Sequence, residues 1–569
     1  MSEQPLPEPE QIKRESRYLR GTLRESVADR ATGALHDDDT HLSKFHGLYQ
    51  QDDRDLRNER RLQKLEPHYQ FMLRLRLPGG VLSPEQWLGL DEIADRYADG
   101  SLRLTTRQTF QFHRVFKENL PALIQALDKL GLDSRGACGD VNRNVISSVN
   151  PHLSHSHRQV YDDAVRISEQ LKWRSAAYEE TWLDQAPKQS EENEEPFYSH
   201  LYLPRKFKVA LTLAPHNDCD VLANDVGLIG IEEHGKLVGY NIAVGGGLGM
   251  TYGESGTYPR LASPVGFVPV ERVVEACETI AAIQRDHGCR TDRAHARFKY
   301  TIDDYGLEWF AERFAEYSDA PLEPLRPYEL TDTGDHFGWL EDEQGFHHLT
   351  LFIRSGRVRD FESPQLRTAL REIAQVHTGE FRVTCNQNLI IARVDKQTKD
   401  AIARIVDHYG LDDGTRQTPL VRDAISCVAF PTCGLAMAES ERYLPELTEK
   451  LEALMTETGI AGEPIKLRIS GCPNGCARPY MGEIGLTGKA PGRYNLYLGA
   501  DTGGQRLNRL YRENIDEAEI LANLKPLLER FANEREEKDG FGDFLYRSEI
   551  LIPDEGPESF HQPLIARSG

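Results

Sequence analysis

Short runs rich in β-branched and aromatic residues alternate along this chain with amphipathic segments. The strand-like runs include residues 103–113 and 381–394, and apolar residues at helical spacing mark residues 84–97 and 366–377. Both parts of the chain repeat this alternation of strand and helix patterns. The sequence therefore predicts a mixed α+β fold.

The same pattern occurs twice, as an internal repeat. The stretch from Gly100 to Gln108 aligns with the stretch from Gly379 to Gln387, 279 positions later. The same spacing relates Gly131 to Gly410, Arg143 to Arg422, Ile146 to Ile425, Ser147 to Ser426 and Val149 to Val428. A register kept without a gap over about fifty positions indicates a duplication.

A later stretch repeats with a shorter spacing of 258 positions. It relates Lys208 to Lys466, Leu211 to Ile469, Gly227 to Gly485 and Gly230 to Gly488. The acidic stretch 190–196 lies between the two matches in the first copy, so we expect an insertion or loop there. The repeat predicts two halves related by a pseudo-twofold axis, with a cofactor at their junction.

The chain has 569 residues, which is longer than a domain with a single hydrophobic core usually is, so we expect several domains. We predict an N-terminal arm in residues 1–64, a repeat domain from 65–135 and 340–414, a central domain from 136–339 and a last domain from 415–569.

The charge balance narrows the choice of partners. The chain carries 68 Lys and Arg against 90 Asp and Glu, a formal charge of −22. This surface disfavours nucleic acid. Clusters of Arg and Lys in so acidic a chain are expected to line an internal site for an anion.

Neither a signal peptide nor a membrane span is predicted. Residues 1–10 lack a basic segment followed by an apolar one, and no apolar run reaches the length of a span. We expect a cytoplasmic protein, in which the nine cysteines serve as ligands, reactive thiols or buried small residues rather than disulfides.

Four cysteines form two closely spaced pairs. Five residues separate Cys427 from Cys433, and three separate Cys472 from Cys476. Four thiolates suit an iron–sulfur cubane or structural zinc, but zinc pairs usually enclose two to four residues. A turn around Pro473 and Gly475 would expose backbone N–H groups to cluster sulfurs. The remaining cysteines show no pairing pattern and are interpreted as structural: Cys138, Cys219, Cys277, Cys289 and Cys385.

These spacings resemble the signature of the siroheme and [4Fe–4S] sulfite and nitrite reductase family. The resemblance extends over nearly the whole chain and also includes residues 105–113, 142–144, 203–208 and 490–495. It implies an internally duplicated α+β fold of three domains around siroheme: a ferredoxin-like repeat domain, a central domain that binds siroheme and substrate, and a last domain that holds the cluster and siroheme. It also implies that Cys476 both ligates the cluster and is the axial ligand of the siroheme iron.

The resemblance implies a cationic pocket, because siroheme carries eight carboxylates. Arg103 and Arg107 also fall at even spacing, on one face of the predicted strand. The expected siroheme-binding residues are Arg103, Arg107, Gln111, His113, Arg205, Arg293, Arg297, Lys299, Asn386, Gln387 and Cys476.

The implied reaction is the six-electron reduction of sulfite to hydrogen sulfide in sulfur assimilation, with Arg74, Arg143, Lys206 and Lys208 around the substrate. Lys206 and Lys208 are two positions apart, so both ammonium groups can reach one site from an extended chain. A desolvated Lys among like charges has a lowered pKa and can relay protons. The alternatives are a nitrite reductase, in which Asn commonly replaces the second lysine, and a four-cysteine zinc protein without enzymatic activity.

No phosphate loop or clean dinucleotide fingerprint is present, so we expect no direct use of NADPH. The segment Gly245–Gly249 lacks the last glycine of that fingerprint and is interpreted as a tight turn or a close backbone approach to the cofactor. By resemblance, a flavoprotein carrying FAD and FMN supplies electrons within a hetero-oligomer. The polar first sixty residues, including 52–61, are a candidate docking arm.

Three nearby histidines, His152, His155 and His157, could suggest a metal site. They have no acidic or thiol companion in the sequence. We interpret them as solvated side chains.

Overall fold

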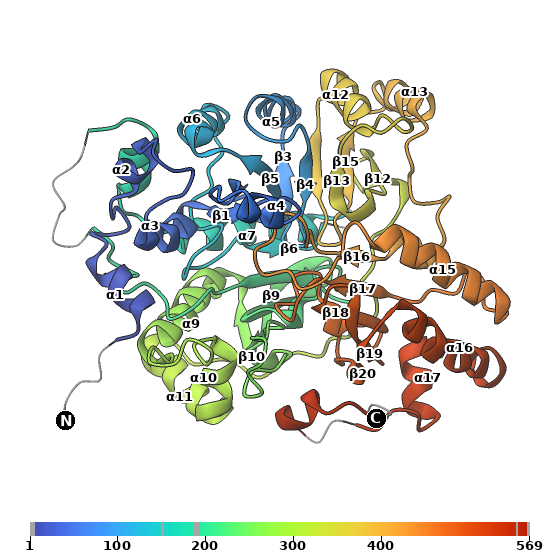
Figure 1. The fold of residues 1–569 in the computed structure, drawn as a ribbon. Coiled ribbons are helices and arrows are strands. Elements are labelled where there is room, and N and C mark those ends of the chain that lie inside the picture. The colour runs from blue at the N-terminus through green and yellow to red at the C-terminus, as the bar shows by residue number, and fades with distance from the viewer. Residues whose placement is uncertain (1–5, 150–152, 187–193, 554–555, 566–569) are drawn as a thin grey trace.

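The computed structural model describes residues 6–149, 153–186, 194–553 and 556–565 of the chain, and these contain four sheets of five strands each (Figure 1). The predicted 190–196 loop falls largely outside the described residues, as does His152. The sheets form two matched pairs. This arrangement confirms the predicted α+β fold.

The first pair of sheets is joined by an exchange of short strands. Strand β3 comes from the first half but pairs with β14 of the second, while β13 of the second half pairs with β4 of the first. One sheet has the order β1 (Leu48–Asp52), β2 (Tyr69–Arg74), β5 (Phe110–Val115), β4 (Leu102–Leu104), β13 (Arg357–Val358). The other has the order β11 (Gly338–Glu341), β12 (His347–Leu351), β15 (Leu389–Val394), β14 (Glu380–Val383), β3 (Val81–Leu82).

Helices cover the outer side of these sheets, where Figure 1 shows them in a row. They are α5 (Pro84–Tyr97), α6 (Leu120–Lys129), α12 (Leu366–Val376) and α13 (Lys399–Tyr409). Ser83 starts α5 with a capping box that includes Gln86. Trp87 of α5 is buried and stacks on Phe381 of the other half, with ring centroids 4.8 Å apart. Both helices predicted from periodicity, α5 and α12, are present.

Each predicted long strand is instead a hairpin. The run 103–113 divides into β4 and β5, and the run 381–394 divides into β14 and β15. Gln108 and Gln387 lie in the two turns with positive φ values of 51° and 70°, which an extended strand cannot contain. The prediction that Arg103 and Arg107 share one strand face is therefore wrong, because Arg107 lies in the turn.

The second pair of sheets has one topology used twice. In each sheet the first three strands in sequence are parallel neighbours and the later pairings are antiparallel. The first contains β6 (Ile146–Ser147), β7 (Val209–Leu213), β8 (Val226–Glu233), β9 (Lys236–Val244) and β10 (Ser263–Pro269). The second contains β16 (Ile425–Ser426), β17 (Leu467–Ser470), β18 (Ile484–Ala490), β19 (Arg493–Leu498) and β20 (Arg509–Ile515).

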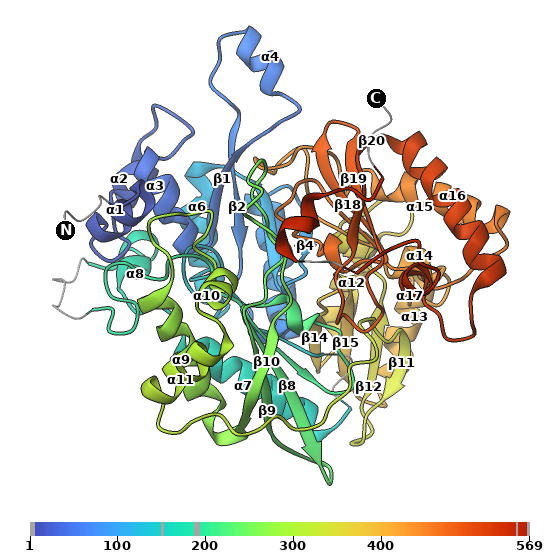
Figure 2. The same cartoon turned by 90° about the horizontal axis from the view of Figure 1, so that it is seen from below.

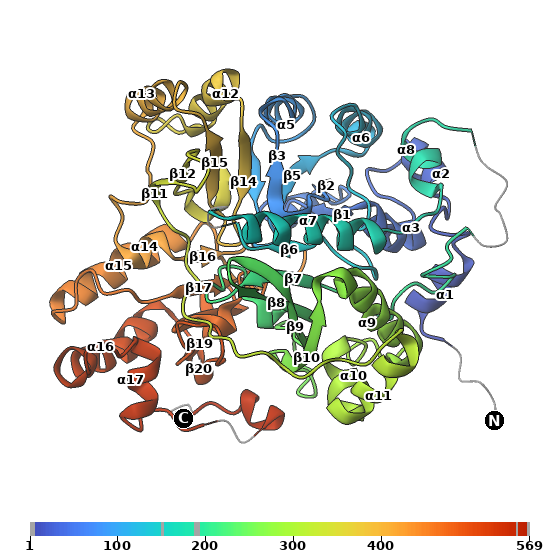
Figure 3. The same cartoon turned by 180° about the vertical axis from the view of Figure 1, so that it is seen from behind.

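The other helices that follow β5 surround these sheets, apart from α8, which packs with α2 and α6. Figure 3 shows α7 crossing between the upper and lower sheets and α9, α10 and α11 at the lower edge. In the same layer the last part of the chain adds α14, α15, α16 and α17. Their bounds are α7 (His155–Gln170), α8 (Ala177–Trp182), α9 (Val273–His287), α10 (Phe298–Tyr305), α11 (Leu307–Tyr317), α14 (Pro419–Arg422), α15 (Leu444–Glu457), α16 (Glu517–Glu534) and α17 (Phe541–Arg547).

Buried side chains form one large core within residues 19–411 and a separate one within residues 420–551. The last part of the chain therefore has a core of its own. The described residues contain no helix long and apolar enough to cross a membrane.

Equivalent residues of the two halves make the same side-chain hydrogen bonds. The Gln108 amide donates to Ser147 O at 2.7 Å and accepts from Ser147 N at 2.8 Å. Its repeat partner Gln387 makes the same pair of bonds with Ser426, at 2.8 and 3.4 Å. Each glutamine thereby ties its hairpin turn to the first strand of the neighbouring sheet.

We expect Gln108→Leu to lower the free energy of unfolding by about 1–3 kcal/mol, because it leaves the buried Ser147 N–H and C=O groups without partners. Unfolding in guanidinium chloride measures the effect, and the exposed Gln397→Leu is the matched control. Equal stability of the two variants would contradict the proposed role of Gln108.

The first 64 residues differ from the predicted arm. Helices α1 (Glu8–Glu15), α2 (Leu23–Ala28) and α3 (Asp37–Leu42) pack on the body, and Leu19 and Phe45 join the large core. Strand β1 is an edge strand of the first sheet. Among residues 6–64, the segment around α4 (Arg57–Leu62) projects from the molecule, as Figure 2 shows. The apolar residues within the polar N-terminal sequence explain the difference.

Candidate active site

The four paired cysteines converge at the ends of two neighbouring strands. Cys427 directly follows β16, and Cys472 lies two residues after β17. Burial and the nearby Cys476 and Cys433 thiols raise the pKa of Cys427 to about 12. Burial and the same neighbours also raise the pKa of Cys472. Thiols held in this way ionise readily only when a metal supplies positive charge.

Backbone N–H groups face these sulfurs. Gly471 N donates to Cys427 Sγ at 3.2 Å. Backbone hydrogen bonds from Asn474 to Cys472, and from Leu435 and Ala436 to Cys433, favour the thiolate forms. Gly475, with φ of 63°, closes the second turn as the sequence predicted.

The sulfur spacing does not suit a single zinc ion. Tetrahedral zinc places its sulfurs about 3.8 Å apart, given Zn–S bonds of about 2.3 Å. In the described part of the chain, no three of the four cysteine sulfurs lie within 4.8 Å of one another. A cubane cluster, which is much wider than one ion, fits four sulfurs that converge at longer range.

Arg54, which the sequence did not single out, holds the first cysteine loop in place. Its Nη1 donates to Cys433 O and Gly434 O, both at 3.1 Å, and to Ala436 O at 3.3 Å. Its guanidinium lies over the Phe430 ring, 4.9 Å from the centroid. The projecting N-terminal segment is thus connected directly to the cysteine loop.

A small polar cavity lies beside Cys476. Five of the predicted residues line it, namely Arg107, Lys206, Lys208, Arg297 and Cys476. The other lining residues are Thr106, Ile146, Cys219, Ala223, Asn224, Leu248, Gly249, Asn474, Gly475 and Arg478. The cavity therefore brings one cysteine of the four next to a group of cations from both halves.

Lys206 and Lys208 are the unpaired cations of this cavity. They flank Phe207 in an extended segment that leads into β7, so both reach the same space. Within the described residues neither ammonium has a hydrogen bond or an ion pair. Burial and then Arg107 and Arg297 lower the pKa of Lys208 to about 7. Burial and the adjacent Lys208 bring the pKa of Lys206 well below its usual value.

Arg74 and Arg143 lie at the border of this cation group. Arg74, at the end of β2, donates to Cys138 Sγ at 3.3 Å and interacts electrostatically with Cys476. Arg143 donates to Gly139 O at 2.8 Å and lies near Lys206 and Arg107. The four predicted substrate-binding cations thus converge on one region.

Gln111 and His113 lie on β5, beside Arg74 of β2. With its amide oriented to suit its neighbours, Gln111 accepts hydrogen bonds from Arg74 and donates to His113 at 3.3 Å. Burial and nearby Arg357 bring the pKa of His113 well below its usual value, so the ring is neutral. These neutral groups orient Arg74.

Three further predicted cations have acidic partners. Arg293 and Arg205 both face Asp140, at 2.9 and 3.7 Å. Arg297 donates through Nη2 to both oxygens of Asp225, at 3.0 Å. Asp225 thus fixes Arg297 at the cavity and leaves its Nε–H without a partner among the described residues, whereas Arg205 and Arg293 lie outside the cavity lining.

Lys299 and the glycine segment form a closed unit. The Lys299 ammonium donates to the carbonyls of Gly247 at 3.1 Å and Gly249 at 3.0 Å, and also to Tyr258 O. A Cβ at Gly246 would lie 2.3 Å from two backbone oxygens. The segment is a tightly packed turn whose Gly249 lines the cavity, in agreement with the sequence interpretation.

Several predicted siroheme-binding residues are not in the cavity lining, namely Arg103, Gln111, His113, Arg205, Arg293, Lys299, Asn386 and Gln387. Arg103 is buried and donates to Ser426 O at 2.9 Å, to Ser355 O and to Glu441. Asn386 accepts from Arg478 at 2.8 Å, and Gln387 bonds Ser426. Their polar groups connect the two halves near the site.

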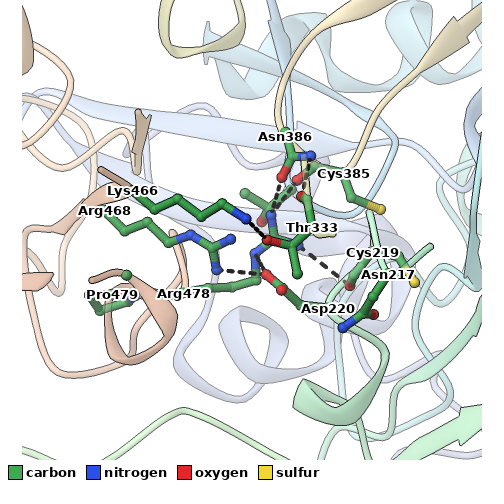
Figure 4. Close-up of polar contacts among 12 residues, drawn as sticks. Asn217, Cys219, Asp220, Thr333, Cys385, Asn386, Lys466, Arg468, Arg478 and Pro479 are labelled. Carbon is green, nitrogen blue, oxygen red and sulfur yellow. Dashed lines mark hydrogen bonds and ion pairs between the residues drawn. The ribbon is translucent and has the colours of Figure 1, made fainter. Parts of the chain in front are cut away.

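Sequence reasoning missed Asp220, Arg468 and Arg478, which form a buried ion cluster next to the cavity (Figure 4). Asp220 Oδ2 lies 2.6 Å from Arg468 Nη1 and 3.0 Å from Arg478 Nε. Asp220 and Arg478 are 258 positions apart and both have a left-handed backbone, with φ values of 49° and 55°. The two halves thus carry opposite charges at one repeated position, and these charges pair across the junction. The repeat alignment contained this signal, because it places Asp220 opposite Arg478.

The two described histidines of the predicted solvated group are separate from the cavity. His155 is exposed, whereas His157 contacts Ser154 at 2.8 Å through Nδ1. Burial lowers the pKa of His157 to about 4. His157 is therefore less solvated than the sequence suggested.

Comparison with known protein families identifies the family to which this chain belongs. The description "Nitrite/Sulfite reductase ferredoxin-like half domain" matches residues 63–130 and 340–409, and "Nitrite and sulphite reductase 4Fe-4S domain" matches residues 163–322. A protein of Chromohalobacter salexigens named sulfite reductase [NADPH] hemoprotein beta-component is 54% identical, with 97% of each chain covered. The chain belongs to the nitrite and sulfite reductase family.

Other members of this family agree over the full length. The relatives of the same name from Staphylococcus haemolyticus and Bacillus subtilis are 52% and 51% identical, covering 97% of this chain and 96% and 97% of theirs. The solved structure of the Mycobacterium tuberculosis NirA protein covers 96% of this chain and 97% of its own, with a TM-score of 0.76 and 26% identity. The family fold thus includes the last part of the chain, with its four cysteines.

Proposed function

We propose that this chain reduces sulfite to sulfide with six electrons, at a siroheme coupled to a [4Fe–4S] cluster. The observation that carries the proposal is the cavity in which Cys476, one of four convergent cysteines, lies beside the unpaired Lys206 and Lys208. Relatives of at least 50% identity along the chain bear the name of this enzyme's hemoprotein component. Sulfide formation by the purified chain, with sulfite and reduced methyl viologen, tests the proposal.

The residues present fit both cofactors. Cys427, Cys433, Cys472 and Cys476 would hold the cluster, with Cys476 shared by the siroheme iron. The buried Nε atoms of Arg107 and Arg297 have no hydrogen-bond partner among the described residues, so they can donate to siroheme carboxylates. When bound, the siroheme iron supplies a ligand position for sulfur and the cluster supplies stored electrons.

Lys206, Lys208, Arg143 and Arg74 bind the anionic substrate and stabilise the charge that develops on its oxygens. Removing the oxygens as water also requires protons. A lysine with a pKa of about 7, such as Lys208, can donate a proton near neutral pH and recover it from solvent. We assign proton delivery to this lysine pair.

Nitrite is the second candidate substrate, since it needs the same number of electrons and fits the same scaffold. Lys208 favours sulfite because a second ammonium in the cavity matches a more highly charged anion. We therefore assign sulfite as the preferred substrate. We assign the cytoplasm as the location, because thiols stay reduced there.

We further propose that a flavoprotein component delivers the electrons at the surface next to the cysteine loop. Leu435, two residues after Cys433, has 65% of its surface exposed, and Leu62 of the projecting α4 has 80%. Arg54 connects the two segments. An exposed apolar residue beside a cluster ligand, and another on the projecting segment, suit a partner that must approach the cluster.

The pure chain is expected to oxidise a reduced dye but not NADPH, because it lacks a nucleotide-binding fingerprint. Absorbance at the NADPH band, with sulfite and without any flavoprotein, measures this. Rapid NADPH oxidation by the chain alone would contradict the need for a partner.

A further inference from the structure

A second group of metal-binding side chains lies outside the cavity, where the loop after β7 meets the linker that leads to β11. Two backbone hydrogen bonds join these segments. Asn217 N donates to Asp332 O at 2.7 Å, and Thr331 N donates to Pro215 O at 3.0 Å. His216 and Asp332 are thus held side by side by the backbone alone.

His216, Asp332 and His336 place their donor atoms within 4.8 Å of one another. His336 Nε2 is 3.7 Å from Asp332 Oδ2, and the two imidazole rings are 5.0 Å apart, nearly perpendicular at 79°. Gly334 N donates to Asp332 Oδ1 at 2.9 Å, so Oδ2 is the oxygen that faces the histidines. In the described part of the chain, this is the only trio of His, Cys, Asp or Glu residues with such close donor atoms.

We propose that His216, Asp332 and His336 bind a zinc ion. Two imidazoles and one carboxylate are a frequent protein ligand set for zinc, with water as the fourth ligand. Calcium and magnesium prefer oxygen ligands and would leave two imidazoles unused. The hydrogen bond from Gly334 orients the carboxylate, as supporting contacts commonly do at metal sites.

The position of His216 in the duplicated plan supports a metal-binding role. The turn 214–218 of the first half corresponds to the turn 472–476 of the second, 258 positions later. That second turn carries Cys472 and Cys476, while Ala214 and Asp218 occupy the equivalent positions in the first. His216 therefore lies at the centre of a turn whose copy carries two of the four proposed cluster ligands.

The zinc ion would fasten the linker between the two halves to the first half. Polar contacts already join the linker and the first half to the last part of the chain: Lys466 bonds Thr333 of the linker, and Asn217 Nδ2 donates to Gly503 O at 3.0 Å. Figure 4 shows Lys466, Thr333 and Asn217 grouped at this junction. Zinc binding should therefore stabilise the folded chain without touching the cavity.

The test uses the protein with its full siroheme and iron content, so that the four cysteines are not available to zinc. Isothermal titration with Zn²⁺ is expected to show one ion per chain. His216→Ala and His336→Ala should each weaken binding by about tenfold or more. Added Zn²⁺ should raise the Tm of the unmodified chain and not that of the double variant.

His408→Ala, at the exposed end of α13, is the matched control and should bind like the unmodified chain. Asp332→Asn preserves the shape of the side chain and tests the carboxylate if a histidine variant folds poorly. Equal zinc affinity and stoichiometry in the unmodified chain, the double variant and Asp332→Asn would overturn the proposal, as would no zinc binding by the unmodified chain.

Discussion

Cys476→Ser is expected to lose sulfite reduction entirely while the chain still folds. Serine oxygen is a poor ligand for an iron–sulfur cluster and for the siroheme iron, and Cys476 is the cysteine of the four that also lines the cavity. Sulfide production with reduced methyl viologen measures the activity. The absorption spectrum and the iron content report the cofactors.

Cys289→Ser is the matched control, because Cys289 is a partly exposed free thiol far along the chain from the paired cysteines. It should keep the spectrum and the activity of the unmodified chain. An unchanged spectrum and sulfide yield in Cys476→Ser would remove this residue from its proposed role.

Lys208→Asn is expected to lower kcat/KM for sulfite by about a hundredfold to a thousandfold, taking the loss of about 2.7–4 kcal/mol for one oxyanion donor as a guide. Nitrite carries one negative charge, and sulfite is partly a dianion at neutral pH. Nitrite reduction should therefore fall less. The ratio of the two kcat/KM values measures this preference and cancels general damage to the cofactors.

The control is Lys236→Asn, which removes an exposed lysine at the start of β9 and should leave both rates unchanged. Siroheme and iron content must match in all proteins compared. If sulfite and nitrite reduction fall by the same factor in Lys208→Asn, this lysine does not discriminate between the substrates.

Much of the fold could be predicted because the same sequence pattern occurs twice in the chain. The repeat of Gln108 at Gln387 and of Ser147 at Ser426 corresponds to two equivalent hydrogen-bonded junctions. The exchange of β3 and β13 between the halves could not be predicted, since strands of two residues carry no periodicity. Hairpin turns within 103–113 and 381–394 were missed because no Gly or Pro marks them.

The cysteines of the site follow from local spacing, but the residues that organise them do not. Arg54 is 379 positions from Cys433, whose carbonyl it binds. Asp220 pairs with Arg468 across 248 positions. Only the three-dimensional structure gives such contacts. The N-terminal arm was predicted from polarity, although a few apolar residues such as Phe45 suffice to anchor that segment in the core.

The most direct test of the proposed function counts electrons and product in one experiment. The purified chain, with siroheme visible in its absorption spectrum, is supplied with sulfite and a measured amount of reduced methyl viologen, and sulfide is quantified. We predict one sulfide for every six electrons consumed. Consumption of the dye without sulfide, or a chain that binds neither siroheme nor iron, would contradict the proposed function.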